Sequence, residues 1–383
     1  MTRNKSDMDN YVVSARKYRP ASFKEVVGQR AITSTLKNAI KNNQLAQSFL
    51  FCGPRGVGKT TCARIMAQTI NCEAITEEGE ACNQCDSCKR FKENTSFNIH
   101  ELDAASNNSV DDIRSLVDQV RIPPQDGKYK VYIIDEVHML SSQAFNAFLK
   151  TLEEPPSYAK FILATTEKHK IIPTILSRCQ IFDFKRIQVK DIVEHLQYVG
   201  KHENIEAETD GLQIIAQKAD GALRDALSIF DQIVSFAGKA FTYQDVIDNL
   251  NVLDYDYYFR LVDSALKNDT SSALLTFNEI LDAGFDGHHF ITGLGEHLRN
   301  LLVSKDEGTI ELLEVGENIR DKYWEQTNHC YISFLTQALN VVSQADIDYK
   351  GSNNKRLHVE IGLLQLCSIT ATPADEVKKK SLS

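Results

Sequence analysis

The sequence predicts an α/β protein that continues into an all-helical part, and two observations lead to this prediction. Between about residues 47 and 184, short runs rich in β-branched and aromatic residues alternate with helical stretches. This alternation is typical of a parallel sheet with crossover helices. After about residue 186 the strand signals fade, and amphipathic stretches follow one another to about residue 370.

Three apolar runs in the first half predict buried strands, because turn or polar residues bound each of them. These runs are "SFLFC" (48–52), "KVYIID" (130–135) and "AKFILAT" (159–165). Helices are expected at 60–70 and 141–154. In the second helix the apolar residues recur at helical spacing, at Phe145, Phe148, Leu149 and Leu152. Pro155 and Pro156 end it, since proline cannot continue a helix.

The helical half divides into two parts. Residues 188–238 carry two or three short helical patterns. Longer amphipathic stretches lie near 255–267, 271–283, 288–303, 329–345 and 355–369. The sequence therefore predicts four segments: a core at 1–187 with an insertion at 72–88, a small helical domain at 188–238, an all-helical domain at 239–370, and a polar tail or linker start at 371–383.

Composition and charge narrow the class of protein. The 383 residues are 42% hydrophobic and 25% charged, an ordinary globular balance. The net charge of −9 argues against coating nucleic acid by bulk charge, although a local basic groove stays open. We expect a cytoplasmic protein, because neither a signal-peptide core nor an apolar run of ~18 residues is evident. Nine cysteines then favour free thiols or metal ligands over disulfides.

A glycine-rich loop follows the first predicted strand. "GPRGVGKTT" (53–61) fits the phosphate-loop pattern G-x-x-x-x-G-K-[ST] and opens a predicted helix, as that motif requires. Its glycines let successive backbone N–H groups point at one anion. We predict that the nucleotide is bound by Gly53, Gly56, Val57, Gly58, Lys59, Thr60 and Thr61. Lys59 would reach the β- and γ-phosphates, and the Thr60 hydroxyl would ligate Mg²⁺.

Two acids end the second predicted strand. Asp135 would complete the Mg²⁺ site, and Glu136 would orient or deprotonate the attacking water. A carboxylate pair alone is a weak signal, but it becomes strong behind a phosphate loop. The pair and the loop together predict an ATPase or a GTPase.

Six segments in order resemble one family, the clamp-loader branch of the AAA+ ATPases. They are "ARKYRPASFKEVVGQ" (15–29), the phosphate loop, "LDAASNNSVDDIR" (102–114), "IIDEVHMLSSQAFNAFLKTLEEPP" (133–156), "LATTEKHKIIPTILSRC" (163–179) and "GALRDALS" (221–228). The resemblance covers at least residues 11–235. It implies ATP as the nucleotide, an AAA+ core, a helical lid domain and an oligomerising helical collar.

The resemblance also implies three further site residues. Arg178 matches the family's arginine finger, which enters a neighbouring subunit's ATP site and stabilises charge on the γ-phosphate. An arginine paired with a surface carboxylate is the alternative. Thr165 matches the first sensor near the γ-phosphate, and Arg224 the second sensor on the lid. The segments Arg16–Pro20 and Val26–Gln29 match those that enclose adenine.

Four clustered cysteines follow the phosphate-loop helix. Cys72, Cys82, Cys85 and Cys88 have the spacing C-x9-C-x2-C-x2-C, which suits a closed tetrahedral Zn²⁺ site of structural type. An iron–sulfur cluster is the alternative, although its usual fourth cysteine followed by proline is missing. Four unliganded thiols are a further alternative.

By resemblance, the expected function is ATP-driven loading of a sliding clamp onto primer–template DNA during replication. Other clamp-loader subunits and further copies of the chain would be partners, within a replisome. Polymerase core and replicative helicase would join them only in a longer form. Two hypotheses compete: another AAA+ DNA motor for branch migration or remodelling, and a nucleotide-binding scaffold that never hydrolyses ATP. A helicase, suggested by "DEVH", is weaker because other helicase motifs are not evident.

Overall fold

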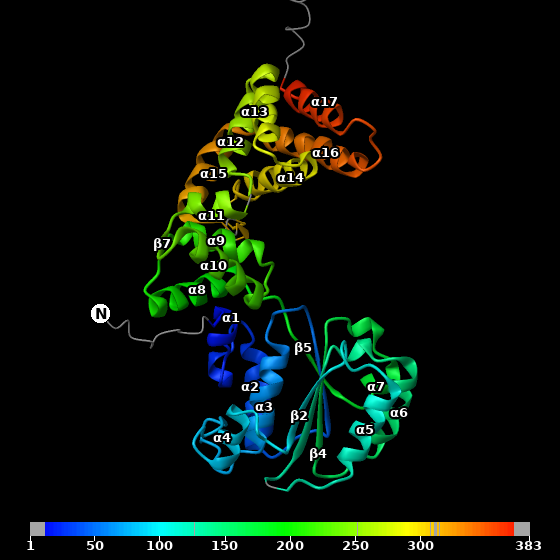
Figure 1. The fold of residues 1–383 in the computed structure, drawn as a ribbon. Coiled ribbons are helices and arrows are strands. Elements are labelled where there is room, and N and C mark those ends of the chain that lie inside the picture. The colour runs from blue at the N-terminus through cyan, green and yellow to red at the C-terminus, as the bar shows by residue number, and fades with distance from the viewer. Residues whose placement is uncertain are drawn as a thin grey trace, which may run out of the picture. The chain divides into compact units, whose positions relative to one another are not determined.

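The computed structural model describes residues 12–125, 127–250, 252–306, 308–309, 312–313 and 315–370. The predicted tail at 371–383 lies outside them. The described chain forms two compact units (Figure 1). The first contains the chain up to Ile205 together with Ile215–Gln232, and the second contains Glu206–Ile214 and the chain from Ile233 on. The three predicted domain boundaries remain a prediction.

A five-stranded parallel sheet forms the centre of the first unit, with the strand order β2-β3-β4-β1-β5. The strands are β1 (Ser48–Cys52), β2 (Ile99–Asp103), β3 (Lys130–Asp135), β4 (Ala159–Thr165) and β5 (Gln180–Asp183). The three strands expected from apolar runs are β1, β3 and β4, and their bounds match the prediction. All three are central and almost wholly buried, which is why they carry continuous apolar runs.

The two strands that the sequence did not predict are the edges of the sheet. In β2, "IHELD" is half-exposed along its length, and in β5 Phe182 is buried among more exposed neighbours. An edge strand has one neighbour and more contact with water, so polar residues replace the apolar run.

Helices cover both faces of this sheet (Figure 1). The helices that lie in the first unit wholly or in part are α1 (Ser14–Lys17), α2 (Arg30–Lys41), α3 (Lys59–Ile70), α4 (Asp86–Lys92), α5 (Val110–Val120), α6 (Ser142–Glu153), α7 (Pro173–Leu176), α8 (Val189–Glu203), α9 (Thr209–Lys218) and α10 (Leu223–Ala237). Short 3₁₀ helices are η1 (Phe23–Glu25), η2 (Val137–Met139) and η3 (Lys168–Lys170). The predicted helix at 141–154 is α6, which the Ser141 hydroxyl caps by accepting from Ala144 N–H.

Strand alternation divides the core into two layers. In β1, Phe49 and Phe51 pack with α2 and α3, whereas Leu50 and Cys52 face the layer beneath α5 and α6. Because the strands are parallel, their carboxyl ends meet at one edge. There Cys52 pairs in register with Thr165, and Asp103 with Asp135. Side chains from loops far apart in the sequence can therefore meet at this edge.

The second unit is helical apart from a two-stranded sheet formed by β6 (Glu206–Ala207) and β7 (Ala240–Phe241). Its helices beyond β7 are α11 (Tyr243–Leu250), α12 (Tyr255–Leu266), α13 (Thr270–Asp282), α14 (Gly287–Val303), α15 (Glu317–His329), α16 (Ile332–Tyr349) and α17 (Lys355–Ser368). Five of them coincide with the predicted stretches. The sequence missed α11, which is short, and α15, which is mostly polar. No helix of the described residues has the length and apolar character needed to span a membrane.

Candidate nucleotide site and cysteine cluster

A cavity of about 690 Å³ lies in the first unit, around the carboxyl ends of β2 and β3 and the start of α3. Its lining comes from four parts of the chain: the segment before η1, the loop that opens α3, the ends of β2 and β3, and the start of α10. The lining includes Arg16, Tyr18, Arg19, Pro20, Val26, Val27, Arg55, Gly56, Val57, Gly58, Lys59, Thr60, Thr61, Glu101, Asp103, Asp135, Glu136, Arg224 and Leu227.

The loop at 53–58 has the backbone that a phosphate loop needs. Gly53, Gly56 and Gly58 have φ of +143°, +76° and +103°, which L side chains rarely adopt. A Cβ on Gly53 would lie 2.4 Å from the Phe184 carbonyl oxygen, so this position also requires glycine sterically. Helix α3 begins at Lys59, directly after Gly58. The N-terminal N–H groups of α3 therefore face the cavity.

Lys59 and Thr60 are held by partners within the chain. The Lys59 ammonium donates to the carbonyl oxygens of Gly53 at 2.8 Å and of Pro54 at 2.7 Å. Burial lowers the pKa of Lys59, and the carboxylates of Glu136 and Asp135 oppose that shift. The Thr60 hydroxyl donates to Asp135 Oδ2 at 2.6 Å. The two oxygens predicted to ligate Mg²⁺ therefore lie side by side.

Glu136 is oriented by Thr166, a residue that the sequence analysis did not single out. Glu136 has φ of +46°, an uncommon conformation outside glycine. Its Oε2 accepts from the Thr166 N–H at 3.1 Å and from the Thr166 hydroxyl at 2.9 Å. His138 Nδ1 lies 3.4 Å from the same oxygen. The carboxylate is thus positioned at the strand edge by the end of β4.

Thr165, the predicted first sensor, is fully buried. Its hydroxyl lies 3.0 Å from His138 Nδ1 and accepts from the Glu167 N–H at 3.1 Å. Both contacts are within the strand-end loops. Among the described residues, those that line the cavity do not include Thr165.

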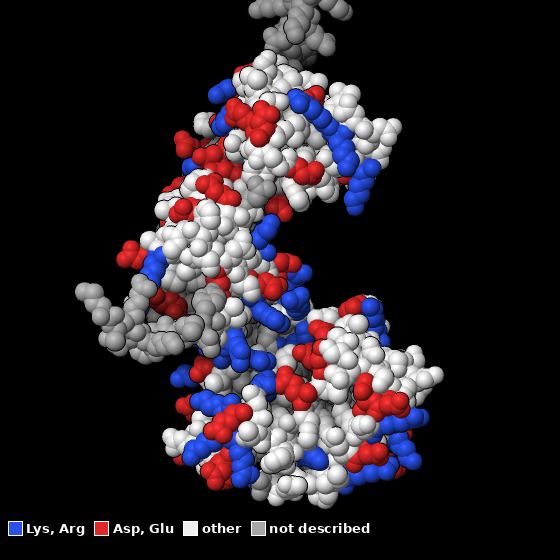
Figure 2. Space-filling model, in the orientation of Figure 1, with Lys and Arg blue, Asp and Glu red and all other residues white. Residues whose placement is uncertain are grey.

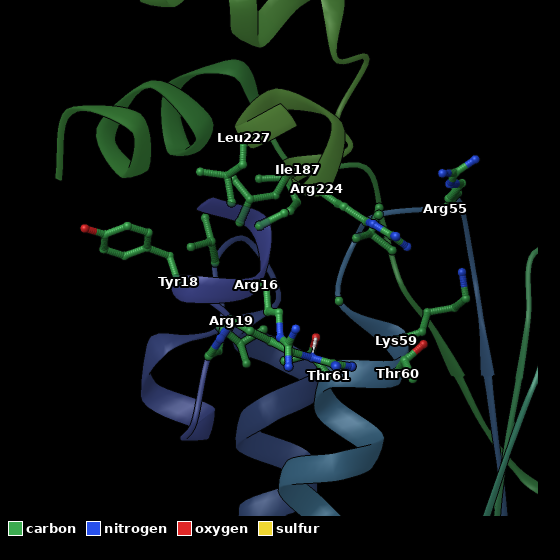
Figure 3. Close-up of a pocket in the computed structure, with 18 of the residues that line it drawn as sticks. Arg16, Tyr18, Arg19, Arg55, Lys59, Thr60, Thr61, Ile187, Arg224 and Leu227 are labelled. Atoms are coloured by element: carbon green, nitrogen blue, oxygen red, sulfur yellow. Dashed lines mark hydrogen bonds between the residues drawn. The ribbon is translucent and has the colours of Figure 1, made fainter. Parts of the chain in front are cut away.

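Four arginines line the cavity together with Lys59 (Figure 3). Arg224 reaches it from the start of α10, and Arg19 extends toward α3, where its Nε donates to the Thr61 hydroxyl at 3.3 Å. Burial lowers the pKa of Arg19 below its ordinary value. Arg16 and Arg55 complete the set. Five cations around a cavity that also holds four carboxylates suit a polyanion that binds with a divalent metal.

Arg178 lies outside this cavity lining, as judged over the described residues. Its Nη2 donates to Glu153 Oε1 at 2.8 Å, and its Nη1 donates to the Thr174 carbonyl at 2.7 Å. The arginine is therefore paired with a carboxylate of α6, which is the alternative that the sequence left open. A role at a neighbouring chain's site would require this pair to break.

The structure thus brings most of the predicted nucleotide site together. Gly56 to Thr61, Asp135, Glu136 and Arg224 line one cavity, while Gly53 contributes its carbonyl to Lys59. Five residues of this region were not predicted from the sequence: Thr166, His138, Arg55, Glu101 and Asp103. The acids "ELD" at 101–103 carried a usable signal, because they end a strand just as Asp135 does. The sequence around Thr166 contains little signal of its role, because that role depends on the conformation of Glu136.

The cysteine cluster is compact. The sulfur atoms of Cys72, Cys82, Cys85 and Cys88 all lie within 4.8 Å of one another, and Cys72 Sγ is 4.0 Å from Cys85 Sγ. Four thiolates on Zn²⁺ are about 3.8 Å apart, given Zn–S bonds of about 2.3 Å. The N–H groups of Gln84 and Cys85 donate to Cys82 Sγ and lower the pKa of this thiol to about 6, whereas burial raises the pKa of the Cys72 and Cys88 thiols. The fit to a thiolate-bound metal therefore rests on the spacing of the four sulfurs.

The small basic run at 168–170 is neutralised by acids. Lys168 pairs with Asp183 at 2.9 Å, and both Lys170 and His169 lie near Glu167. More widely, Lys and Arg lie among Asp and Glu over the visible face of each unit (Figure 2). The basic run at 168–170 therefore does not indicate a DNA-binding surface.

Comparisons with known proteins agree with this architecture. Three family models match in order: "DNA polymerase III, delta subunit" over residues 28–188, "DNA polymerase III clamp loader subunit, ATPase lid domain" over 191–239, and "DNA polymerase III subunits gamma and tau domain III" over 242–382. The sheet order, the phosphate loop and the lid match define an AAA+ ATPase of the clamp-loader class.

Curated relatives identify the family. DNA polymerase III subunit tau of Bacillus subtilis is 40% identical over 96% of this chain and 65% of its own length. DNA polymerase III subunit gamma of Buchnera aphidicola subsp. Baizongia pistaciae is 37% identical over 95% of this chain and 99% of its own. The chain belongs to the gamma/tau family of DNA polymerase III subunits. It spans less than two thirds of the Bacillus protein.

A solved structure of a Thermotoga maritima RuvB mutant (K64R) covers 65% of this chain and 79% of its own, with 19% identity and a TM-score of 0.47. A likeness this loose carries no argument about function.

Proposed function

We propose that this chain is an ATP-hydrolysing clamp-loader subunit whose nucleotide site is completed by Arg178 of an adjacent subunit. One observation carries the proposal. The cavity gathers Lys59, Thr60, Asp135 and Glu136 from two distant loops, whereas Arg178 makes its contacts elsewhere in the same unit. Arg178 thus lies apart from the groups that would bind the nucleotide and the water, as expected where subunits share a site.

Each residue has a distinct task in this mechanism. Bound Mg²⁺, held through Thr60 and Asp135, would offset charge on the β- and γ-phosphates. Lys59 would leave the carbonyls of Gly53 and Pro54 for phosphate oxygens, which offset its lost hydrogen bonds. Water attacks the γ-phosphorus, the bond to the β–γ bridging oxygen breaks, and ADP leaves with that electron pair.

Glu136 would orient the water and accept its proton, which requires it to exchange its Thr166 contacts for the water. Thr165 directly precedes Thr166 in the chain. Because Thr165 does not line the cavity, it could contact the γ-phosphate only after a local movement of the strand-end loops. Arg224 would contact the phosphates from α10. Arg178 of the neighbouring subunit would stabilise charge on the leaving phosphoryl group.

Partners follow from the family. We propose that the chain assembles with other clamp-loader subunits and further copies of itself in the cytoplasm, and acts on a sliding clamp and primer–template DNA. DNA binding through phosphates should then weaken steeply with salt. In a longer form of the chain, the polymerase core and the replicative helicase would be further partners.

We further propose that the cysteine cluster holds one structural Zn²⁺. The four sulfurs leave no ligand position for a substrate or water. Metal analysis of the purified chain should find about one zinc per chain. Bound iron, together with the visible absorption of an iron–sulfur cluster, would instead establish the iron–sulfur alternative.

The shared site is tested with two variants, Lys59→Ala and Arg178→Ala. Each is assayed for ATPase activity with clamp and primed DNA, alone and after mixing before assembly. Mixing should recover activity above either variant, because one interface then pairs an intact Lys59 with an intact Arg178. Arg121→Ala is a matched control, since this arginine is exposed and pairs with Asp118 on its own helix.

If co-assembled variants recover nothing, Arg178 acts within its own chain or only in folding, and the shared site is wrong. If wild-type protein hydrolyses no ATP with clamp and primed DNA, the scaffold hypothesis holds. Hydrolysis that responds to branched DNA but not to the clamp would favour a branch-migration motor.

A further inference from the structure

The cysteine cluster lies close to the nucleotide cavity along the chain. Helix α3 begins with Lys59 and Thr60 in the cavity and ends just before Cys72. The segment from Cys72 to Asn94, here called the cysteine module, then returns to β2, whose end also lines the cavity. None of the roles proposed for the nucleotide site uses this module.

A buried glutamate ties the module to one wall of the cavity. Glu80 is 9% exposed and lies two residues before the ligand Cys82. Its Oε2 accepts from the Phe23 N–H at 3.0 Å, and its Oε1 accepts from the Lys24 N–H at 3.2 Å. Lys37 pairs with the same carboxylate at 3.2 Å. A buried carboxylate with three donors is a specific contact, because its desolvation must be offset.

Phe23 and Lys24 do not line the cavity themselves, but they belong to the segment that carries this wall. Pro20 precedes them and Val26 follows, and both line the cavity. The Phe23 side chain is 2% exposed and packs in the same core cluster as Val26 and Val57, the latter from the phosphate loop. Fixing these two backbone N–H groups therefore fixes the path of the wall.

The position of Glu80 depends on the module. Glu80 N–H donates to the Thr76 hydroxyl at 3.1 Å, and its carbonyl accepts from the Thr76 N–H at 3.0 Å, so it ends a tight turn. The next residue, Ala81, is buried in a small cluster that otherwise consists of the four cysteines. This cluster is too small to be held by apolar burial alone, so a bound metal would set its geometry.

A second contact reaches another part of the lining, at β2. Arg64 of α3 pairs with Glu101, which lines the cavity at the end of β2. The Arg64 guanidinium also lies 5.1 Å from the centre of the Phe91 ring and donates to Asn94 Oδ1 at 3.4 Å. Phe91 belongs to α4, the helix that carries Cys88. The module thus contacts residues next to two parts of the cavity lining.

We infer that the cysteine module couples metal occupancy to nucleotide affinity, with Glu80 as the positioning residue that transmits it. A metal bound by the four thiolates orders the turn before Cys82, and Glu80 then holds the wall that encloses the nucleotide. Without the metal the wall is less ordered. Nucleotide binding must then order the wall, and this cost lowers the affinity. This inference rests on the nucleotide site proposed above.

The test measures the affinity of the full chain for a fluorescent ADP analogue in Mg²⁺, with and without zinc. Zinc is removed by a chelator that leaves Mg²⁺ in solution, and its loss is measured. Removal should weaken binding by about 5- to 20-fold, in the range of known coupling between sites. Glu80→Ala should weaken binding by a similar factor and make it insensitive to zinc removal.

Two further variants separate positioning from general damage. Glu80→Gln retains an acceptor for the two N–H groups and should recover much of the affinity. Glu78→Ala removes an exposed acid of the same loop and should leave affinity and its zinc dependence unchanged.

Hydrogen exchange on the wild-type chain keeps the inference testable if Glu80→Ala does not fold. Removing zinc should speed exchange at Phe23 and Lys24 while the central strands stay protected. The inference is overturned if zinc-free wild-type protein binds the analogue as tightly as the zinc-bound protein. It is also overturned if Glu80→Ala keeps the full zinc dependence. Failure of zinc-bound wild type to bind the analogue would instead overturn the proposed function.

Discussion

The nucleotide cavity and the corner that holds Arg178 belong to the same compact unit, but they are built differently. In the cavity, two predicted groups have partners within the chain that a nucleotide and Mg²⁺ can replace: Lys59 donates to loop carbonyls, and Thr60 donates to Asp135. Arg178 instead has a carboxylate of α6 and a carbonyl of α7, outside the cavity. The difference indicates that binding and hydrolysis can be separated by mutation.

The largest effect is expected from Arg178→Ala. In an assembled oligomer with clamp and primed DNA, ATP hydrolysis should fall by about 10³-fold, the low end for an arginine finger. Affinity of the isolated chain for the ADP analogue should stay within about twofold, because Arg178 does not line its own cavity. Single-turnover hydrolysis and equilibrium binding measure the two quantities. An equal loss of binding in the isolated chain would show that Arg178 serves its own site.

A smaller effect is expected from Arg224→Ala. Losing one guanidinium that contacts phosphates should weaken nucleotide affinity by about 10-fold, the equivalent of one hydrogen bond to a charged group. Arg224→Lys should restore part of the affinity, since it keeps the charge but not the planar fork. If Arg224→Ala weakens nucleotide binding in the isolated chain and Arg178→Ala does not, the contrast between the cavity and the corner that holds Arg178 becomes clearer. Unchanged binding would remove Arg224 from the nucleotide site.

The smallest effect is expected from Glu153→Gln. The Arg178–Glu153 pair is partly exposed, so losing it should lower the free energy of unfolding by less than about 1 kcal/mol. In the oligomer, hydrolysis should stay equal or rise by no more than about fivefold, since Arg178 no longer has to leave a carboxylate. Thermal unfolding and clamp-stimulated hydrolysis test this. A drop as large as that of Arg178→Ala would mean that Glu153 holds the arginine in its working position.

Glu80 and Glu136 illustrate why part of the site could be predicted and part could not. Glu136 follows an apolar strand behind a phosphate loop, so its neighbours in sequence predicted a place near the phosphates. Glu80 stands in a polar loop with three other glutamates, and nothing local distinguishes it from Glu77 or Glu78. Its burial against Phe23 and Lys24 depends on how two segments 56 positions apart pack together.

The sequence by itself determined the three central strands, the phosphate loop, the acids at the end of β3 and the spacing of the four cysteines. These features depend on local chemistry: continuous burial, glycine at positive φ, and ligands within a short segment. Tertiary structure decided the edge strands β2 and β5, the hold of Thr166 on Glu136, the pairing of Arg178 with Glu153, and the ties from the cysteine module to the cavity. Each of these depends on residues brought together by strand order and loop packing, and such contacts leave no periodic or local pattern in the chain.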